Sequence, residues 1–551
     1  MRNPLSTSCL LMTVTLGACG DEEGAAAGDS EATAITGGAE EVGDEGSSGE
    51  STTGGDEPTT GEPFTPILAR GDVRIARVEA NPGVAVPIGL DGLEVGGSDR
   101  NGYIPRGRDT MIRAYVDVPD GWTARPLEAR LVLSGGGVDT TMTQTLMISD
   151  DSRDAVIESG FYFGVKAEQM VPGLRYQISL WETAPGQEAL PEPAVPATAP
   201  LTGSALVGVE SKTAAMRVVL VPVDYSNGGC SKVVDGEAHR AAFETALFQE
   251  NPIQSLELEV HAPYKVTYDM KTFGGLSKLV GEMSQLRTDE GADDNVYYFG
   301  LFDSCGACIG GDGIQGGCTV GLAADITGPD RGDARFRAAA GQLTDGAEST
   351  FVHEIGHTQG RQHIYCAGAG VQAAGTDPSY PHEDGRIGVW GFGIRDFKLR
   401  HPTVNSDYMS YCGKTWVSDW QWTATYKRIV TLSAWGSSDA VAPESGGVLI
   451  GAVDPDGQQL WWTGPGDLSG ARELSGTHSV VFEFADGEVE APAQVSVRAH
   501  YPTRNIVARL PVGFDERELL GVRLRDEDGE HAVAATSIRR LHGPDRLQAA
   551  Q

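Results

Sequence analysis

Three histidines and a glutamate lie within eleven positions of the segment FVHEIGHTQGRQH, residues 351–363. His353 and His357 are four residues apart, so on a helix both imidazoles project from one face, one turn apart. This spacing lets both rings bind a single Zn²⁺ ion. Glu354 is rotated by about 100° from the first histidine, so it can lie beside a metal-bound water and accept its proton without being a ligand. A histidine-rich surface helix is the alternative interpretation of the same residues.

The segment that follows favours the metal site. Thr344 or Asp345 is expected to cap a helix that runs to about Gln359. Gly360 tolerates the left-handed conformation that ends a helix sharply, and the turn can bring His363 back to the same metal as a third ligand. Three protein ligands leave one position open for water or substrate, which is the arrangement of a catalytic zinc site.

These residues resemble the metzincin metallopeptidases, whose HExxHxxGxxH signature is matched by His353, Glu354, His357, Gly360 and His363. The family also has a methionine turn beneath the zinc, and SDYMSY, residues 406–411, supplies Met409 in that role. Tyr411 matches the position at which some metzincins place a tyrosine near the metal, where it binds the ion or donates to the oxyanion; an ordinary packed tyrosine is the alternative. A gluzincin-type site fits less well, because Gly360 and His363 follow the metzincin spacing.

The resemblance covers about residues 212–436 and implies an α/β catalytic domain. It implies an edge strand at 319–326 that binds extended peptide, and a C-terminal helix at 417–435 that begins at Ser418 or Asp419. Ile364, directly after the third histidine, is not a residue typical of the well-known groups, so the family within the clan is not assigned. His382 and His401 are expected to be surface or loop histidines, because three ligands suffice.

Six cysteines lie between residues 230 and 412, and an even number in an exported chain predicts three disulfides. A four-thiolate zinc site at Cys230, Cys305, Cys308 and Cys318 is the alternative. Within the metzincin resemblance, Cys366 and Cys412 would both lie near the floor of the cleft, three residues after His363 and Met409 respectively. We therefore expect a Cys366–Cys412 disulfide that joins the third-ligand loop to the methionine turn.

The first residues have the layout of a bacterial export signal. Arg2 precedes a short apolar run that ends in Leu-Gly-Ala-Cys, and this ending resembles a lipobox in which Cys19 is acylated. A plain signal peptide is the alternative. Residues 20–62 carry 13 Asp or Glu and no Lys or Arg, and they contain almost no large apolar side chain, so they are expected to form a disordered linker. We expect an outer-membrane or surface lipoprotein, with a secreted or periplasmic protein as the alternative.

The remaining chain divides by its periodicity. Short alternating β-type runs separated by Pro and Gly fill the region before residue 210, and similar runs return after residue 436. Strands alternate with helices between them, as in an α/β layer. The prediction is a central metzincin-like α/β domain between two β-sandwich-like modules, divided as follows: 1–18 signal peptide, 19–65 linker, 66–210 first β module, 211–436 peptidase domain, 437–551 second β module.

The net charge of −35 argues against nucleic acid or an anionic membrane surface as partner. With the histidine motif and the methionine turn, the predicted function is a zinc endopeptidase that acts on surface or extracellular proteins. It is expected to contact the membrane only through a lipid anchor. A non-catalytic, adhesin-like lipoprotein on a protease fold is the alternative. Calcium in the loops GADDN, residues 291–295, or GDGIQGG, residues 311–317, is a further interpretation, although such loops are more often simply solvated.

Overall fold

The structure of the protein is a computed structural model. It describes residues 64–309, 318–324, 331–369, 373, 375–435, 447–453, 459–465, 478–498, 501–514, 517–526, 529–534 and 538–540. The predicted signal peptide, Cys19 and nearly all of the acidic linker lie outside these residues, as does the loop GDGIQGG.

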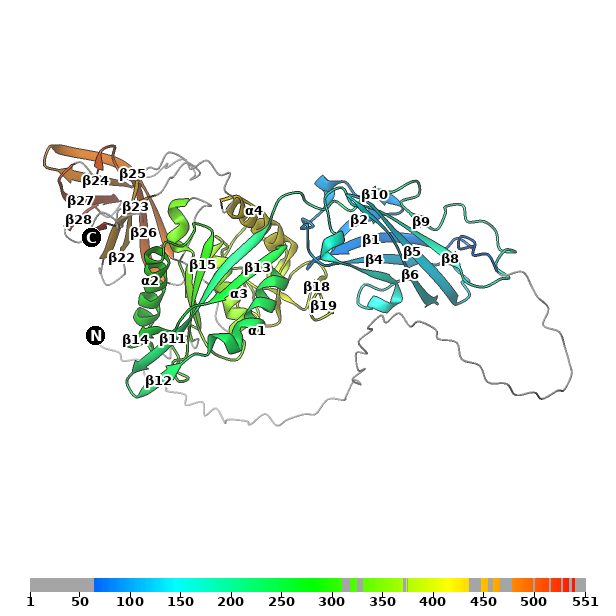
Figure 1. Cartoon of the computed structure of the whole chain (residues 1–551), viewed down its shortest axis with the longest axis horizontal. Helices are drawn as coiled ribbons and strands as arrows, with labels where there is room; N and C mark the ends of the chain where they lie inside the picture. The colour runs from blue at the N-terminus through cyan, green and yellow to red at the C-terminus, as the bar shows by residue number, and fades with distance from the viewer. Residues whose placement is uncertain are drawn as a thin grey trace, which may run out of the picture. The chain divides into compact units, whose positions relative to one another are not determined.

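The first β module contains two antiparallel sheets, drawn in blue and cyan in Figure 1. One has the strand order β3-β2-β1-β4-β7, and the other has the order β10-β8-β5-β6 with β9 beside β8. Burial alternates along β5, as expected for a strand with one face toward a core. The bounds are β1 Arg74–Asn81, β2 Val86–Leu90, β3 Leu93–Glu94, β4 Thr110–Asp117, β5 Arg125–Gly135, β6 Val138–Ile148, β7 Phe161–Val165, β8 Arg175–Glu182, β9 Thr198–Ala199 and β10 Ala205–Leu206.

A seven-stranded mixed sheet forms the centre of the α/β region. Strand β11 pairs in parallel with β13, β14 and β15, and β15 pairs in parallel with β17. The short edge strand β16 runs antiparallel to β17. The bounds are β11 Ala215–Asn227, β12 Cys230–Val233, β13 Ser255–Val260, β14 Tyr264–Val266, β15 Val296–Phe302, β16 Gly321–Ala323 and β17 Ala338–Gln342.

Helices cover both faces of this sheet (Figure 1). Alternate residues of β15 divide between two cores: Tyr297 and Phe299 pack with residues of α1 and α3, whereas Tyr298 packs with the apolar stripe of α2. A strand buried on both faces has a nearly continuous apolar sequence, and β15 reads VYYFGLF with every residue buried. The bounds are α1 Gly236–Glu250, α2 Phe273–Asp289, α3 Ala347–Thr358 and α4 Asp419–Trp435. Ser418 Oγ accepts a hydrogen bond from the amide of Gln421, so it caps α4 as predicted.

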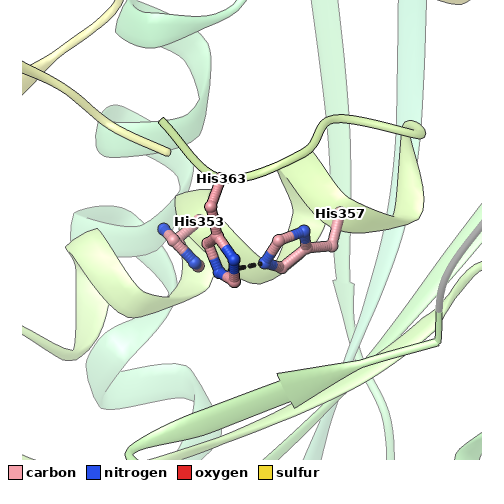
Figure 2. Close-up of side chains that lie close together, drawn as sticks. All are labelled: His353, His357 and His363. Atoms are coloured by element: carbon pink, nitrogen blue, oxygen red, sulfur yellow. Dashed lines mark hydrogen bonds between the residues drawn. The ribbon is translucent and has the colours of Figure 1, made fainter. Parts of the chain in front are cut away.

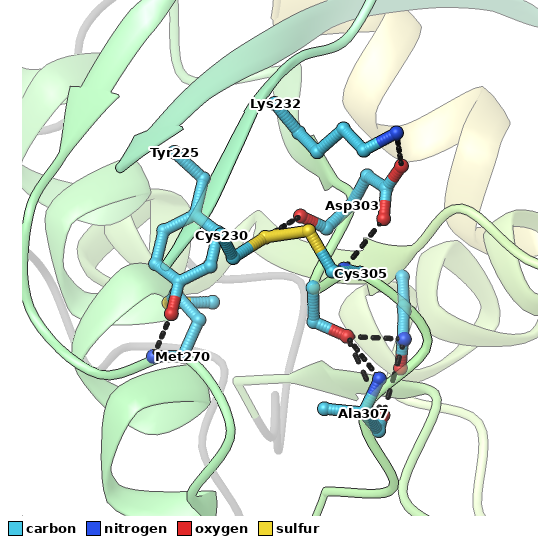
Figure 3. The surroundings of a disulfide bond; sticks show 9 residues. Tyr225, Cys230, Lys232, Met270, Asp303, Cys305 and Ala307 are labelled. Atoms are coloured by element: carbon cyan, nitrogen blue, oxygen red, sulfur yellow. Dashed lines mark hydrogen bonds and ion pairs between the residues drawn. A yellow bond between two sulfur atoms is a disulfide. The ribbon is translucent and has the colours of Figure 1, made fainter. Parts of the chain in front are cut away.

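Two disulfides fasten the loops around this sheet. Cys230–Cys305 joins β12 to the segment after β15, and Figure 3 shows the neighbouring ion pair between Lys232 and Asp303. Cys308–Cys318 closes the next loop. The four-thiolate zinc site is therefore wrong, because these sulfurs are oxidised in pairs. Together with Cys366–Cys412, the three disulfides indicate a protein that folds outside the cytoplasm.

A buried arginine links the first β module to the α/β region. Arg108 is fully buried, and its guanidinium donates to the carbonyl oxygens of Pro82 (2.6 Å), Ile253 (2.8 Å) and Gln249 (3.2 Å). Gln249 lies in the last turn of α1, where helix carbonyls lack partners within the helix. Arg108 also lies over the ring of Trp422 in α4. The two regions therefore share buried polar and apolar contacts.

The second β module differs from a simple sandwich. Its described strands form one continuous order, β28-β27-β24-β25-β26-β22-β23-β29. Both β24 and β26 pair with β25. Among the described strands of the module, only β23 and β29 pair in parallel. The bounds are β22 Gly447–Val453, β23 Gln459–Pro465, β24 Ser479–Phe484, β25 Gly487–Arg498, β26 Tyr501–Arg509, β27 Leu519–Asp526, β28 Gly529–Ala534 and β29 Ile538–Arg540.

Four short strands complete the described structure: β18 Gly391–Gly393, β19 Lys398–Arg400, β20 Ser406–Asp407 and β21 Thr415–Trp416. None of the helices in the described part of the chain combines the length and apolar character that crossing a bilayer requires.

Candidate metal centre

The three histidines of the motif converge in the structure. One ligand atom from each of His353, His357 and His363 lies within 4.8 Å of the others, and all three residues are buried or nearly so. Figure 2 shows two rings reaching from α3 toward the ring of His363, which comes from the segment after the helix. Two nitrogens bound to one zinc at about 2.1 Å lie at most about 4.2 Å apart, so small ring movements bring the set to bonding distance.

Backbone carbonyls orient two of these rings. Nδ1 of His353 donates to the carbonyl oxygen of Tyr408, and Nδ1 of His357 donates to that of Arg361, each at 2.8 Å. A carbonyl only accepts, so each Nδ1 carries the hydrogen and each Nε2 keeps its lone pair. Nε2 of His357 lies 3.1 Å from Nε2 of His363. Burial, with His363 acting in the same direction, lowers the pKa of His353 to about 3, so this ring stays in the neutral form that binds metals.

The end of α3 brings the third histidine back toward the helix. Gly360 has φ +77°, and its amide donates to the carbonyl of His357 while the amide of Arg361 donates to that of Gly356. These two hydrogen bonds form a Schellman motif, which turns the chain back along the helix. The role predicted for Gly360, ending the helix in the left-handed conformation, is confirmed.

The start of α3 differs from the prediction. Gly346, with φ +87°, occupies the N-cap position, and neither Thr344 nor Asp345 provides a side-chain cap. The amide of Ala347 instead donates to the carbonyl of Thr344. A tight backbone turn therefore replaces the expected side-chain cap, and glycine accommodates its positive φ.

The methionine turn lies directly against the ligand helix. Met409 is fully buried, and an added Cβ at Gly356 would lie 2.5 Å from its sulfur and 2.8 Å from the Tyr408 ring. Gly356 stands between the two helical ligands, so only a glycine there lets the turn approach this closely. Met409 was predicted to lie beneath the histidines, and its sulfur lies against Gly356, between His353 and His357 on the helix. No role was predicted for Gly356.

Asp407 is a second residue of the site for which no role was predicted. Its Oδ1 accepts from the amide of Met409 (2.9 Å), and its Oδ2 accepts from the amide of Ser418 (3.2 Å) at the start of α4. The buried carboxyl thus fixes the turn and joins it to the last helix. An Asp two residues before a turn residue is the usual signal of an Asx turn, and SDYMSY contains that signal.

Glu354 lies between the ligands and the edge of the sheet. It is only 3% exposed, and an added Cβ at Gly321 of β16 would lie 2.5 Å from its Oε1. The glutamate is therefore held where the edge strand runs past the ligand helix. The predicted edge strand is present at Gly321–Ala323. Of the expected range 319–326, residues 319, 320 and 324 lie outside the strand, and 325–326 lie outside the described residues.

Tyr411 borders the same site. Its ring centroid lies 4.9 Å from that of His363 and 5.8 Å from that of His353. Burial and then the charge of Glu354 raise its pKa well above the ordinary value, so the phenol stays protonated and can donate a hydrogen bond at neutral pH. The tyrosine is also 38% exposed, unlike an ordinary core tyrosine.

The structure contains the expected Cys366–Cys412 disulfide, which joins the segment after His363 to the methionine turn. His382 and His401 are not part of the triad: His382 lies 2.6 Å from an oxygen of Asp419, and the ring of His401 meets that of Trp390 edge to face. In GADDN, Asp293 forms an ion pair with Arg217. Among the described residues, only the histidine triad forms a group that could hold a metal ion.

Comparisons with known proteins add little to this geometry. The chain matches no family model and no curated protein. Among solved structures, one similar chain belongs to "Structure of a chaperone-substrate complex", with a TM-score of 0.22 and 15% identity over 50% of this chain and 40% of that chain. The match spans less than half of that chain, and a likeness of this size carries no argument about fold or function.

Proposed function

We propose that the protein is a zinc-dependent endopeptidase that hydrolyses peptide bonds of proteins outside the cytoplasm. The observation that carries the proposal is the buried, convergent set of three imidazoles with a carboxylate beside it. His353, His357 and His363 would hold the ion. Zinc, when bound, supplies Lewis acidity that polarises a peptide carbonyl and makes water more acidic.

The remaining chemistry belongs to residues of this chain. Glu354, next to the triad and almost fully buried, accepts the proton of the attacking water and passes it to the leaving amine. Tyr411 keeps its hydroxyl proton and donates it toward the oxygen that becomes negative in the transition state. Met409 supports the histidines from beneath as an apolar surface and is not a ligand.

The edge strand gives the substrate a place beside these groups. β16 is antiparallel to β17 on one side, and Gly321 puts its backbone against Glu354. An extended peptide that adds to this edge by main-chain hydrogen bonds would place a carbonyl near the triad. Binding through the backbone suits a peptidase whose substrates share little sequence.

The proposed location is the outer membrane or cell surface, with Cys19 as the lipid attachment site and the acidic linker as spacer. The three disulfides support an oxidising compartment. The net charge of −35 supports protein rather than nucleic acid as partner.

Metal removal tests the proposal. The whole chain, stripped with a chelator, should release about one zinc per chain and lose cleavage of an unfolded protein, and one equivalent of zinc should restore both. Zinc that binds tightly while the protein cleaves no unfolded protein or peptide would contradict the peptidase and leave a binding role.

A further inference from the structure

Two segments of the site run side by side in parallel with a constant offset of 46 residues. Ile364 forms a parallel bridge with Ser410, and its amide donates to the carbonyl of Met409 at 2.9 Å. The Cys366–Cys412 disulfide has the same separation of 46. In this register Tyr365 lies opposite Tyr411, one position beyond the bridge.

Exposure alternates along the first of these segments. Ile364 is 1% exposed and Cys366 is 2% exposed, whereas Tyr365 between them is 54% exposed. Successive side chains of an extended segment point to opposite sides, so Tyr365 projects from the side opposite to these two buried neighbours. Its partner in the register, Tyr411, is also partly exposed and contacts the His363 ring.

Tyr365 has no structural task among the described residues. Its hydroxyl is hydrogen-bonded to none of them, and its ring stacks on none of their aromatic rings. A single exposed aromatic residue is ordinary. Tyr365 is held in place instead. Ile364, directly before it, forms the β-bridge with Ser410, and Cys366, directly after it, forms the disulfide. His363 lies two residues before it. A rigid aromatic ring contributes contact area at a low cost in conformational entropy.

A second exposed apolar side chain lies on the edge-strand side of the site. Val320 is 37% exposed and directly precedes Gly321, the residue against Glu354. The carbonyl of Val320 accepts a hydrogen bond from the amide of Gln342, which fixes this position against the sheet. Exposed apolar groups therefore stand both beside the base and beside the third ligand.

We propose that Tyr365 is a specificity-determining residue, whose ring packs on a bulky apolar or aromatic side chain next to the scissile bond. Tyr411 beside it is already engaged with the histidines, so Tyr365 supplies the ring that is available for the substrate. The proposal rests on the proposed peptidase function and narrows its substrates to peptides with a large apolar residue at that position. The ring face rather than the hydroxyl makes the contact, so phenylalanine should replace Tyr365.

A binding experiment with the zinc-loaded whole chain tests this proposal without requiring turnover. Two peptide hydroxamates that differ only in a benzyl or a methyl side chain beside the metal-binding group are titrated by calorimetry. Wild type should bind the benzyl compound more tightly than the methyl compound. Tyr365→Ala should weaken binding of the benzyl compound about five- to tenfold and leave binding of the methyl compound unchanged. Two control variants should bind both compounds as wild type does. Tyr365→Phe keeps the ring, and Met147→Ala removes a side chain of similar exposure (64%) from β6.

The outcomes separate the two proposals. The role of Tyr365 would be overturned if wild type bound both hydroxamates equally. It would also be overturned if Tyr365→Ala, with normal zinc content, lost affinity for both hydroxamates to the same extent. Wild type that binds zinc but neither hydroxamate would instead contradict the proposed peptidase site. In peptide cleavage, Tyr365→Ala should lower kcat/KM for substrates with Phe next to the scissile bond and not for substrates with Ala there.

Discussion

The amide of Ile364 donates a hydrogen bond to the carbonyl of Met409. This bond joins the residue after the third ligand to the centre of the methionine turn, and the Cys366–Cys412 disulfide closes the same pair of segments two residues further on. The position of His363 therefore depends on a loop that is distant in the sequence. The histidine triad is held together by contacts between α3, the segment after it and the methionine turn.

Removing this disulfide should weaken metal binding as well as stability. It closes a loop of 46 residues, for which chain entropy predicts about 4 kcal/mol. Cys366→Ser with Cys412→Ser should lower the Tm and loosen zinc binding by at least about tenfold. The control is Cys308→Ser with Cys318→Ser, which opens a loop of 10 residues that contains none of the three histidines. Equal zinc affinity in both double variants would contradict a role for Cys366–Cys412 in holding the third ligand.

Gly356→Ala should separate the methionine turn from the ligand helix. The new methyl group would lie 2.5 Å from the Met409 sulfur and 2.8 Å from the Tyr408 ring, and a tightly packed core resists such overpacking by about 1–3 kcal/mol. We expect lower zinc affinity and a lower unfolding free energy, measured by metal titration and denaturant unfolding. Gly281→Ala in α2 meets no atom within 4 Å and should be neutral or stabilising. If the two alanine variants behave alike, the close approach at Gly356 is not required.

Gly321→Ala should impair catalysis more than zinc binding. An added methyl group would lie 2.5 Å from Oε1 of Glu354 and would move the proposed base, whereas the three histidines keep their backbone contacts. We expect a fall in kcat of at least about tenfold with one zinc retained, because displacing a general base removes part of a 10²–10⁴-fold effect. The strand glycine Gly164, with no atom near its added Cβ, provides the control. Unchanged kcat in Gly321→Ala would show that Glu354 does not depend on the edge strand.

Glu250 should make the protein less stable as pH rises. Burial and then the neighbouring Asp407 raise the pKa of Glu250 from 4.5 to about 8. The folded state therefore binds this proton more tightly than the unfolded state. The resulting contribution to the free energy of unfolding is complete below pH 4.5 and is lost as pH rises through about 8. Each pKa unit corresponds to about 1.4 kcal/mol. Glu250→Gln should remove this pH dependence of the unfolding free energy in denaturant titrations between pH 5 and 8.5. The control Glu237→Gln, at the exposed start of α1, should keep it. Parallel curves of unfolding free energy against pH for wild type and Glu250→Gln would contradict the assignment.

Arg108→Ala should destabilise the α/β region although the residue belongs to the first β module. Its loss leaves three carbonyls without their donor in a buried site, at about 1–3 kcal/mol for each buried group. The Tm should fall by several degrees or more, and unfolding should remain cooperative. Arg106→Ala, which removes a single exposed hydrogen bond to the carbonyl of Ser211, is the control. A Tm for Arg108→Ala equal to that of the control would show that the two regions are energetically independent.

Local patterns predicted most of the ligand helix. The i, i+4 spacing and the glycine at the helix end depend on residues that are close in sequence, so His353, His357 and the turn at Gly360 could be placed before the structure was known. The alternation of apolar residues likewise located strands of the first β module, such as β5, whose residues alternate between buried and partly exposed. The cap of α3 was wrong because Gly346 forms a backbone turn that side-chain capping preferences do not describe.

Contacts between distant segments were harder to predict. Nothing near Gly321 in the sequence indicates that its hydrogen atom faces the Glu354 carboxylate, because this contact depends on how α3 crosses the sheet edge. The second β module shows the same limit: alternation located its strands, but pairing through β25 into one continuous order depends on register over long distances. Cys366 and Cys412 were predictable only because the motif and the methionine turn placed both beside one site.

The most direct test of the account compares wild type with Glu354→Gln, which preserves the shape of the side chain but cannot accept the proton. Zinc content and kcat/KM for an unfolded protein substrate are measured on the same preparations. We predict one zinc per chain in both proteins and a fall in kcat/KM of about 10²–10⁴-fold in the variant. Equal kcat/KM with equal zinc content would contradict the assignment of Glu354 as the base and, with it, the proposed peptidase mechanism.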